Sequence, residues 1–234
     1  MEYLNKYTAV VRGYDDDKLL VQLNEKLDIN RLSKIYEGFD EYPREVIIKF
    51  QDPRKVSERQ RKFFFALLND ISMATDHTKS SLQEYFYSMY EDVTGDAMSL
   101  SASNTSVSDV TFLINLVLDF IFENDIPFKE GYEILPENQD HYFYKCIMSR
   151  TCCICGKHAE IDHFDHAVGR RNRNKIDNTQ FTFAALCSIH HQEKHIIGVT
   201  EFKNKYHMWG VKLDADDIKK MKIGGYAEED IDES

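Results

Sequence analysis

The sequence has few of the residues that interrupt regular structure: only 10 of its 234 residues are Gly and 4 are Pro. Together with an apolar content of 42%, this composition is typical of a globular chain rather than a disordered one. No apolar run approaches the length that crosses a membrane, and the N-terminal MEYLNKYTAVV lacks the charged-then-apolar pattern of a signal peptide. We therefore expect a soluble, cytoplasmic protein with no membrane partner.

Basic residues are also in short supply, with 29 Lys and Arg against 40 Asp and Glu and a formal net charge of −11. That balance argues against a protein that coats nucleic acid in general, since phosphate binding needs local positive charge. The charge is uneven, however. Residues 1–144 hold 15 basic and 26 acidic residues, residues 145–213 hold 11 and 6, and residues 214–234 hold 3 and 8. A basic segment thus lies between two acidic ones.

Cysteine and histidine are concentrated in the same basic segment. All five Cys lie between positions 146 and 187, and six of the nine His lie between 158 and 195. Disulfide scaffolds spread Cys through a short secreted chain, whereas clustered Cys with His indicates metal binding in a reducing compartment.

The N-terminal half reads as mixed strand and helix. Apolar and β-branched runs predict strands at 7–13, 18–23 and 45–50, a short helix at 28–39 and a long apolar helix at 107–123. Two capping-box patterns, Ser57-x-x-Gln60 and Ser81-x-x-Glu84, predict the starts of two further amphipathic helices. The irregular stretch 129–145 is the predicted linker.

Two ligand pairs of metal-binding spacing lie in the C-terminal part, Cys152-x-x-Cys155 and Cys187-x-x-His190. Each spacing lets one turn of the chain bind one tetrahedral ion, and three thiolates with one imidazole complete a closed structural zinc site. The alternative is that these residues are buried free thiols. This interpretation is the weaker one, because two such pairs occur in one short segment. Cys146 and Cys153 fall outside the spacing and are expected in the core.

A second set of metal-type residues lies between and after the two pairs: Asp162, His163, Asn178, His191 and His195. Two His residues four positions apart on a helix project to the same face, so both rings could reach one ion. Asp162 could add an oxygen ligand, and three protein ligands with open positions suit a catalytic metal. His163 would lie beside that ion, where it could deprotonate a water.

The order of these residues resembles the zinc-stabilised HNH endonucleases, which have a ββα-metal fold. The resemblance covers about 45 residues, and it implies that His163 is the general base. It implies that Asp162 and His191 bind a single catalytic Mg²⁺ or Mn²⁺, and that Asn178 braces the ββ loop or joins the metal shell. His195 matches a second helix histidine that only some branches have. The expected products carry a 5′-phosphate and a 3′-hydroxyl.

Two features depart from this pattern or leave it open. Many relatives have Cys where this chain has His190, although His is an acceptable zinc ligand. A second Asp-His step, Asp165-His166, offers an alternative register for the catalytic pair, and we favour Asp162-His163 because it lies a short distance after the first ligand pair. Four basic residues of the following loop would alone indicate a solvated face, but beside a nuclease site phosphate contact is the better interpretation. They are Arg170, Arg171, Arg173 and Lys175.

The N-terminal part, roughly residues 5–128, resembles the phage Orf (NinB-like) recombination mediators in its β-α-β opening and its Gln60-Arg61-Lys62 helix. A further helix, a Ser-rich loop at 99–106 and the long apolar helix complete the resemblance. It implies binding to single-stranded DNA or to single-strand-binding protein, and a homodimer. The positive patch would then comprise Arg54, Lys55, Arg59, Arg61 and Lys62.

We therefore predict an α+β protein in which an N-terminal mixed β/helical domain precedes a small zinc-stabilised ββα-metal (HNH) domain. The predicted boundaries are 1–128, a linker at 129–145, 146–213 and an acidic tail at 214–234. The predicted function is a phage-type HNH endonuclease, in the cytoplasm of a bacterial host, that cleaves DNA in recombination or replication. The alternative is a non-catalytic recombination mediator that binds single-stranded DNA or single-strand-binding protein and whose zinc module is purely structural.

Overall fold

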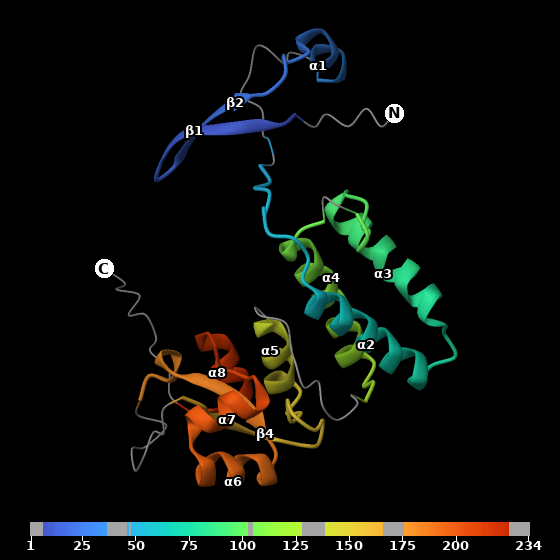
Figure 1. Ribbon diagram of the computed structural model, residues 1–234. Coiled ribbons are helices and arrows are strands. Elements are labelled where there is room, and N and C mark those ends of the chain that lie inside the picture. Colours follow the sequence, from blue (N-terminus) through green and yellow to red (C-terminus); the bar gives the residue numbers. More distant parts are fainter. Residues whose placement is uncertain are drawn as a thin grey trace. The chain divides into compact units, whose positions relative to one another are not determined.

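The computed structural model describes residues 7–36, 46, 48–102, 105–127, 139–165 and 176–224. The chain forms two compact units, Met1–Phe50 and Gln51–Ser234, which are described separately below. In its described part the molecule is an α+β protein with two small antiparallel sheets and eight α-helices (Figure 1).

The first unit is a β-hairpin followed by a short helix. Strands β1 (Ala9–Asp15) and β2 (Lys18–Leu23) pair antiparallel around a turn at residues 16–17, with an irregularity between Val11 and Gly13. Helix α1 (Ile29–Ile35) begins where the Asp28 carboxylate accepts a hydrogen bond from the Arg31 backbone N–H at 3.0 Å. The predicted hairpin is confirmed, and the predicted helix ends earlier than expected within the described residues.

The predicted buried strand at 45–50 is wrong for the residues that the structure describes there. Residues 46 and 48–50 have no strand pairing, and Val46, Ile48 and Phe50 are exposed. Apolar residues in a short run are compatible with a strand, but a strand also needs a neighbour with free backbone groups. The sheet in this unit contains only β1 and β2 among the described residues.

Three long helices form the first half of the second unit: α2 (Glu58–Ala74), α3 (Lys79–Thr94) and α4 (Val107–Glu123), which lie side by side (Figure 1). Capping boxes at Ser57 and Ser106 satisfy the first backbone donors of α2 and α4. Helix α4 buries one continuous apolar stripe at helical spacing, which explains its central position. That stripe comprises Val110, Leu113, Ile114, Val117, Leu118 and Ile121.

Helix α3 begins three residues before the predicted capping box. The hydroxyl of Thr78 accepts a hydrogen bond from the Ser81 backbone N–H at 3.2 Å, so Thr78 and not Ser81 is the N-cap. Both residues can cap a helix. The Glu at position 84 completed a capping-box pattern with Ser81, and this favoured the later start. Gly95 ends α3 in the left-handed conformation at φ 70°, which favours glycine.

Helix α5 (Asp140–Met148) connects the layer of helices α2, α3 and α4, called the helical layer below, with the C-terminal sheet. Its Lys145 and His141 contact the Asp119 carboxylate of α4 at 2.9 and 2.7 Å. Burial alone would raise the pKa of Asp119, but the hydrogen bonds from Lys145 and His141 outweigh it, so the pKa lies below its usual range. On its other side, the Tyr142 hydroxyl donates to the Cys153 carbonyl at 2.8 Å. One hydrophobic core therefore runs from α2 to α8 through α5.

The second half of this unit is a three-stranded antiparallel sheet in the order β3-β4-β5, with β3 at Glu160–His163, β4 at Thr182–Leu186 and β5 at Val211–Lys212. Helices α6 (Ser188–Ile197), α7 (Val199–Tyr206) and α8 (Ala215–Met221) follow (Figure 1). Strand β4 is buried along most of its length, so the sheet is part of the core.

The compact units divide at residue 50, inside the segment that we assigned to a single N-terminal domain. The prediction of an irregular linker is wrong for residues 140–145, which belong to α5 and bury Tyr142 and Phe143 in the core. The predicted acidic tail begins just before α8, whose Ile218 is fully buried. Residues 225–234 lie outside the described part of the chain. The boundaries of independently folding domains stay a prediction, which limited proteolysis would check.

Candidate active site

Cys152, Cys155, Cys187 and His190 form a compact cluster in which every pair of ligand atoms lies within 4.8 Å. The first two Cys are on the turn between α5 and β3, Cys187 is the N-cap of α6, and His190 is in the first turn of α6. The Nδ1 atom of His190 lies 3.4 Å from Cys152 Sγ and 3.3 Å from Cys187 Sγ, and the Sγ atoms of Cys155 and Cys187 are 3.7 Å apart.

These separations fit one tetrahedral zinc ion. Zn–S bonds of about 2.3 Å at tetrahedral angles give S–S edges of about 3.8 Å, and N–S edges are slightly shorter. The cluster can therefore hold a metal such as zinc. The three thiolates and the imidazole would supply all four ligands, so the ion would have no open position. In that arrangement the ion would fasten the turn after α5 to the start of α6.

The surroundings of the thiols affect their pKa values differently. Burial raises the pKa of both Cys146 and Cys153, which lie in the core outside the cluster. Burial also acts to raise the pKa of Cys187, but hydrogen bonds from the backbone N–H groups of His190 and Ile189 and from the Cys155 thiol outweigh it, and the pKa is lowered. Backbone donors at the start of α6 thus favour the thiolate of Cys187, which is the form that binds metal.

Strands β3 and β4 and helix α6 bring the second set of predicted residues together. Asp162 pairs in register with Ala184 of β4, and its Oδ1 lies 3.1 Å from His191 Nε2 on α6. His191 Nε2 lies 3.2 Å from His195 Nε2, one helical turn further along. Asp162, His191 and His195 thus form a chain of contacts with His191 in the middle, whereas only the Cys-His cluster closes to within 4.8 Å among the described residues.

His163, the residue after Asp162, points to the opposite side of the strand from Asp162 and is almost fully buried, with 4% of its surface exposed. Its Nε2 lies 2.7 Å from Oδ1 of Asn178, which is completely buried in a short 3₁₀ helix at Asn178–Gln180. The Asn178 Nδ2 donates to the Ile176 carbonyl at 3.3 Å, which fixes the orientation of the amide. Since Oδ1 only accepts, His163 carries its proton on Nε2, and Nδ1 is the basic nitrogen.

Lys194 is a member of this site that the sequence analysis missed. It lies on α6 three residues after His191, its side chain is only 4% exposed, and its ammonium group pairs with Asp162 Oδ2. A Lys between two His residues looks like part of a solvated helix face. The signal that could have identified it is its i+3 position from His191, which places both residues on one face of the helix.

The alternative Asp-His step occupies a different environment. The Asp165 carboxylate accepts a hydrogen bond from the Thr182 hydroxyl at 2.6 Å and forms an ion pair with Lys203. His166 lies outside the described residues, as do the predicted phosphate contacts Arg170, Arg171, Arg173 and Lys175. Asp162 contacts α6 and His163 contacts Asn178, and the choice between the two Asp-His steps stays a prediction.

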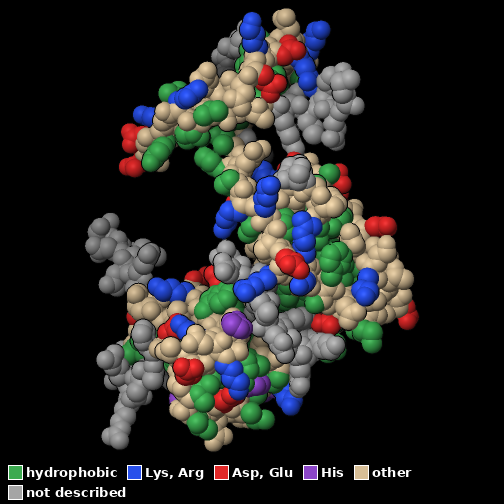
Figure 2. All heavy atoms as spheres, in the orientation of Figure 1, with side chains coloured by type: hydrophobic (Ala, Val, Ile, Leu, Met, Phe, Trp, Pro, Cys, Tyr) green, Lys and Arg blue, Asp and Glu red, His purple; other side chains and the backbone are tan. Residues whose placement is uncertain are grey.

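The basic patch predicted for the helical layer is largely engaged within the chain. Arg54 pairs with Asp52 at 2.9 Å, Lys62 pairs with Glu58 at 2.8 Å, and Arg61 donates to the Leu100 carbonyl. On the face shown in Figure 2, Lys and Arg side chains lie interspersed with Asp and Glu. The side chains of Arg54 and Lys62 nevertheless stay 59% and 76% exposed, so pairing leaves both cations at the surface.

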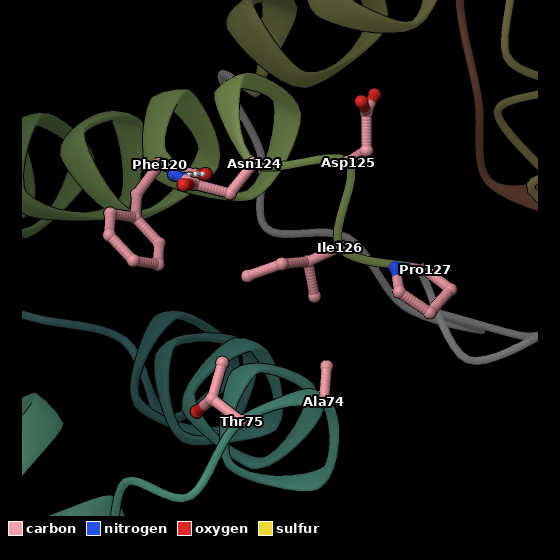
Figure 3. Close-up of a pocket in the computed structure, with 7 residues that line it drawn as sticks. All are labelled: Ala74, Thr75, Phe120, Asn124, Asp125, Ile126 and Pro127. Atoms are coloured by element: carbon pink, nitrogen blue, oxygen red, sulfur yellow. Dashed lines mark hydrogen bonds between the residues drawn. The ribbon is translucent and has the colours of Figure 1, made fainter.

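A pocket of about 330 Å³ lies in the helical layer, where the ends of α2 and α4 approach each other (Figure 3). It is lined by Ala74, Thr75, Phe120 and the segment 124–127, and Ile126 projects into the space between the two helix ends. None of its lining residues belongs to the clusters described above.

Comparison with known proteins gives one match. A family model described as "Putative HNHc nuclease" matches residues 27–225. No curated protein and no solved structure matches the chain. Among the described residues, none of the helices is long and apolar enough to cross a membrane.

Proposed function

The chain belongs to this family of HNHc nucleases, and on that premise we propose that it is a metal-dependent endonuclease that hydrolyses DNA phosphodiester bonds. The observation that carries the proposal is the arrangement around β3. Asp162 meets His191 of α6 at 3.1 Å, while the next residue, His163, meets Asn178 at 2.7 Å. Two consecutive residues at this strand end thus supply a metal ligand and a held imidazole, on opposite sides of the strand.

The residues around Asp162 fit a divalent cation by their chemistry. A carboxylate oxygen and an imidazole nitrogen lie within 3.1 Å of each other, and the second imidazole of His195 lies 3.2 Å from the first. A carboxylate ligand suits Mg²⁺ or Mn²⁺. Asp162 and His191 would be the ligands, with His195 as an outer one. When bound, the ion would neutralise the charge that develops on the departing 3′ oxygen.

His163 acts in this proposal as the general base. Asn178 accepts a hydrogen bond from the Nε2–H group, so Nδ1, a buried atom, is the nitrogen that would take the proton of an attacking water. The water oxygen forms the new bond to phosphorus and gives its proton to His163. The bond to the 3′ oxygen breaks, that oxygen takes a proton from solvent, and the products carry a 5′-phosphate and a 3′-hydroxyl. Asn178 holds the ring in the productive tautomer and orientation throughout.

The Cys-His cluster has a structural part in this proposal. Zinc held by Cys152, Cys155, Cys187 and His190 would fix the N-terminal end of α6, the helix that carries His191. A closed site with four protein ligands leaves no position for substrate, so the zinc would not take part in hydrolysis.

The substrate class follows from charge. With a net charge of −11, and with Arg54 and Lys62 of the helical layer in ion pairs, non-specific duplex binding should be weak and salt-sensitive. We therefore propose branched or single-stranded recombination intermediates as substrates, with recruitment by single-strand-binding protein. A phage recombination setting, a bacterial cytoplasm and a homodimer are further parts of this proposal, carried by the resemblance of the N-terminal part.

The test is a cleavage assay on plasmid, single-stranded and branched DNA with Mg²⁺ or Mn²⁺. Wild type should cleave and His163→Ala should lose at least about a hundredfold in rate, since general-base catalysis contributes about 10²–10⁴. His158→Ala serves as the matched control, because His158 is exposed and belongs to neither cluster. Absence of cleavage by wild type on every substrate would support the non-catalytic alternative, and equal cleavage by His163→Ala would refute the assigned base.

A further inference from the structure

Lys194 is the only Lys or Arg among the buried residues that the structure describes. An ammonium group taken out of water carries a large desolvation cost unless it is paired and hydrogen-bonded. Its position in the middle of α6, one turn from His191, therefore calls for a compensating set of partners.

The partners are three acceptors on three consecutive residues. Lys194 Nζ pairs with Asp162 Oδ2 and lies 3.3 Å from both the His163 carbonyl and the Phe164 carbonyl. An ammonium group has three donors, so this set uses all of them. The Phe164 ring lies below the ammonium at 5.3 Å to its centroid. Lys194 thus binds the strand end that carries both Asp162 and His163.

The two oxygens of Asp162 are divided between two residues of α6. The Oδ2 atom forms the ion pair with Lys194, and the Oδ1 atom lies 3.1 Å from His191 Nε2. We propose that Lys194 is a positioning residue that sets the charge and the denticity of the metal centre. It keeps Oδ2 occupied, so the carboxylate offers a single oxygen to the ion, and it cancels the negative charge of that carboxylate. This inference rests on the proposed function.

A charge count shows the consequence. The Asp162 carboxylate and the Lys194 ammonium cancel, and neutral imidazoles add nothing, so the centre keeps the full double charge of a divalent ion. A phosphodiester anion is then attracted more strongly than by a centre in which the carboxylate remains uncompensated. The cost is a weaker hold on the ion, because the ion approaches beside a fixed positive charge. In a chain with a net charge of −11, Lys194 thereby raises the positive charge of the metal centre, which is where the phosphodiester would bind.

The test measures binding rather than turnover, with the full-length, zinc-loaded chain carrying His163→Ala to prevent cleavage. Isothermal titration with Mn²⁺ should show that Lys194→Met binds the ion at least about tenfold more tightly, whereas Lys194→Arg stays within about threefold of its parent. At saturating Mn²⁺, the affinity for a short DNA oligonucleotide should fall at least about fivefold in Lys194→Met and be retained in Lys194→Arg.

Lys194→Gln keeps a hydrogen-bond donor but lacks the charge, and it replaces Lys194→Met if the latter fails to fold by circular dichroism. It should show the same tighter Mn²⁺ binding and weaker DNA binding. Mn²⁺ affinity that is unchanged or weaker in the neutral variants would overturn the inference, since a merely structural Lys would lower metal affinity on removal.

Asp162→Asn separates this failure from that of the proposed function. If Asp162→Asn abolishes Mn²⁺ binding and the Lys194 variants bind like their parent, only the role of Lys194 is refuted. If Asp162→Asn binds Mn²⁺ like its parent, the ion does not use this carboxylate, and both the proposed metal centre and the role of Lys194 are refuted.

Discussion

Replacing Asn178 by Ala should impair the base without removing it. The bond between His163 Nε2 and Asn178 Oδ1 is 2.7 Å long and lies between one residue that is 4% exposed and one that is fully buried. In Asn178→Ala the Nε2–H group would stay buried without this acceptor, which costs about 1–3 kcal/mol. The ring escapes that cost by moving its proton to Nδ1 or by rotating.

That cost sets the size of the effect. An energy of about 1–3 kcal/mol corresponds to a roughly fivefold to 150-fold loss of the tautomer that carries its proton on Nε2. We expect the single-turnover rate of DNA cleavage to fall by the same factor. The same loss should lower the free energy of unfolding by a few kcal/mol at most, since the Ile176 carbonyl also loses a donor.

Two variants isolate the cause. Asn178→Asp keeps an oxygen acceptor of similar size for His163, so its rate should exceed that of Asn178→Ala. Gln180→Ala removes an exposed amide from the same short helix and should stay within about twofold of wild type. If folded Asn178→Ala cleaves at the wild-type rate, or if Asn178→Asp is the slower of the two, the assignment of the Nε2–H tautomer is wrong.

Three further predictions concern stability. Cys152→Ser should lower bound zinc, measured by elemental analysis, together with the Tm; unchanged zinc would contradict the ligand assignment. Gly210→Ala should cost about 1–3 kcal/mol in urea unfolding, because a Cβ there would lie 2.8 Å from the Thr182 Cβ, within the sheet; a neutral effect would show that the sheet edge yields. Since the Asp119 pKa is lowered by Lys145, its contribution is present above the unfolded value of 3.8 and is lost as pH falls through the folded value. Asp119→Asn should therefore flatten the acid side of the stability curve, and an unchanged curve would contradict this contribution.

Much of the fold could be predicted from local patterns. The first two strands and helix α4 follow from apolar and β-branched runs, and the start of α2 follows from its capping box. These signals act over a few residues. The exposed conformation of residues 46 and 48–50 could not be predicted, because a strand depends on a partner elsewhere in the chain. The start of α3 was missed because two hydroxyl residues three positions apart can both cap a helix.

The candidate site divides in the same way. The spacing of the Cys and His residues was enough to predict the cluster, because each pair lies on a single turn of the chain. The approach of Asp162 to His191 spans 29 positions, and the order of the motif was enough to indicate it. Lys194 was missed because its role depends on the carbonyls of β3, which carry no signature in the sequence.

Helix α5 has a consequence for dissection of the protein. Its Tyr142 donates a hydrogen bond to the carbonyl of Cys153, next to the Cys-His cluster, and its Lys145 pairs with Asp119 of α4. Its buried face belongs to the same core as α2 and β4. A fragment that begins after α5 would lose this wall of its core, so the nuclease part should express as an insoluble or molten fragment. A fragment that begins near residue 51 keeps α5 with both of its neighbours and is the smallest piece that we expect to melt in one cooperative transition.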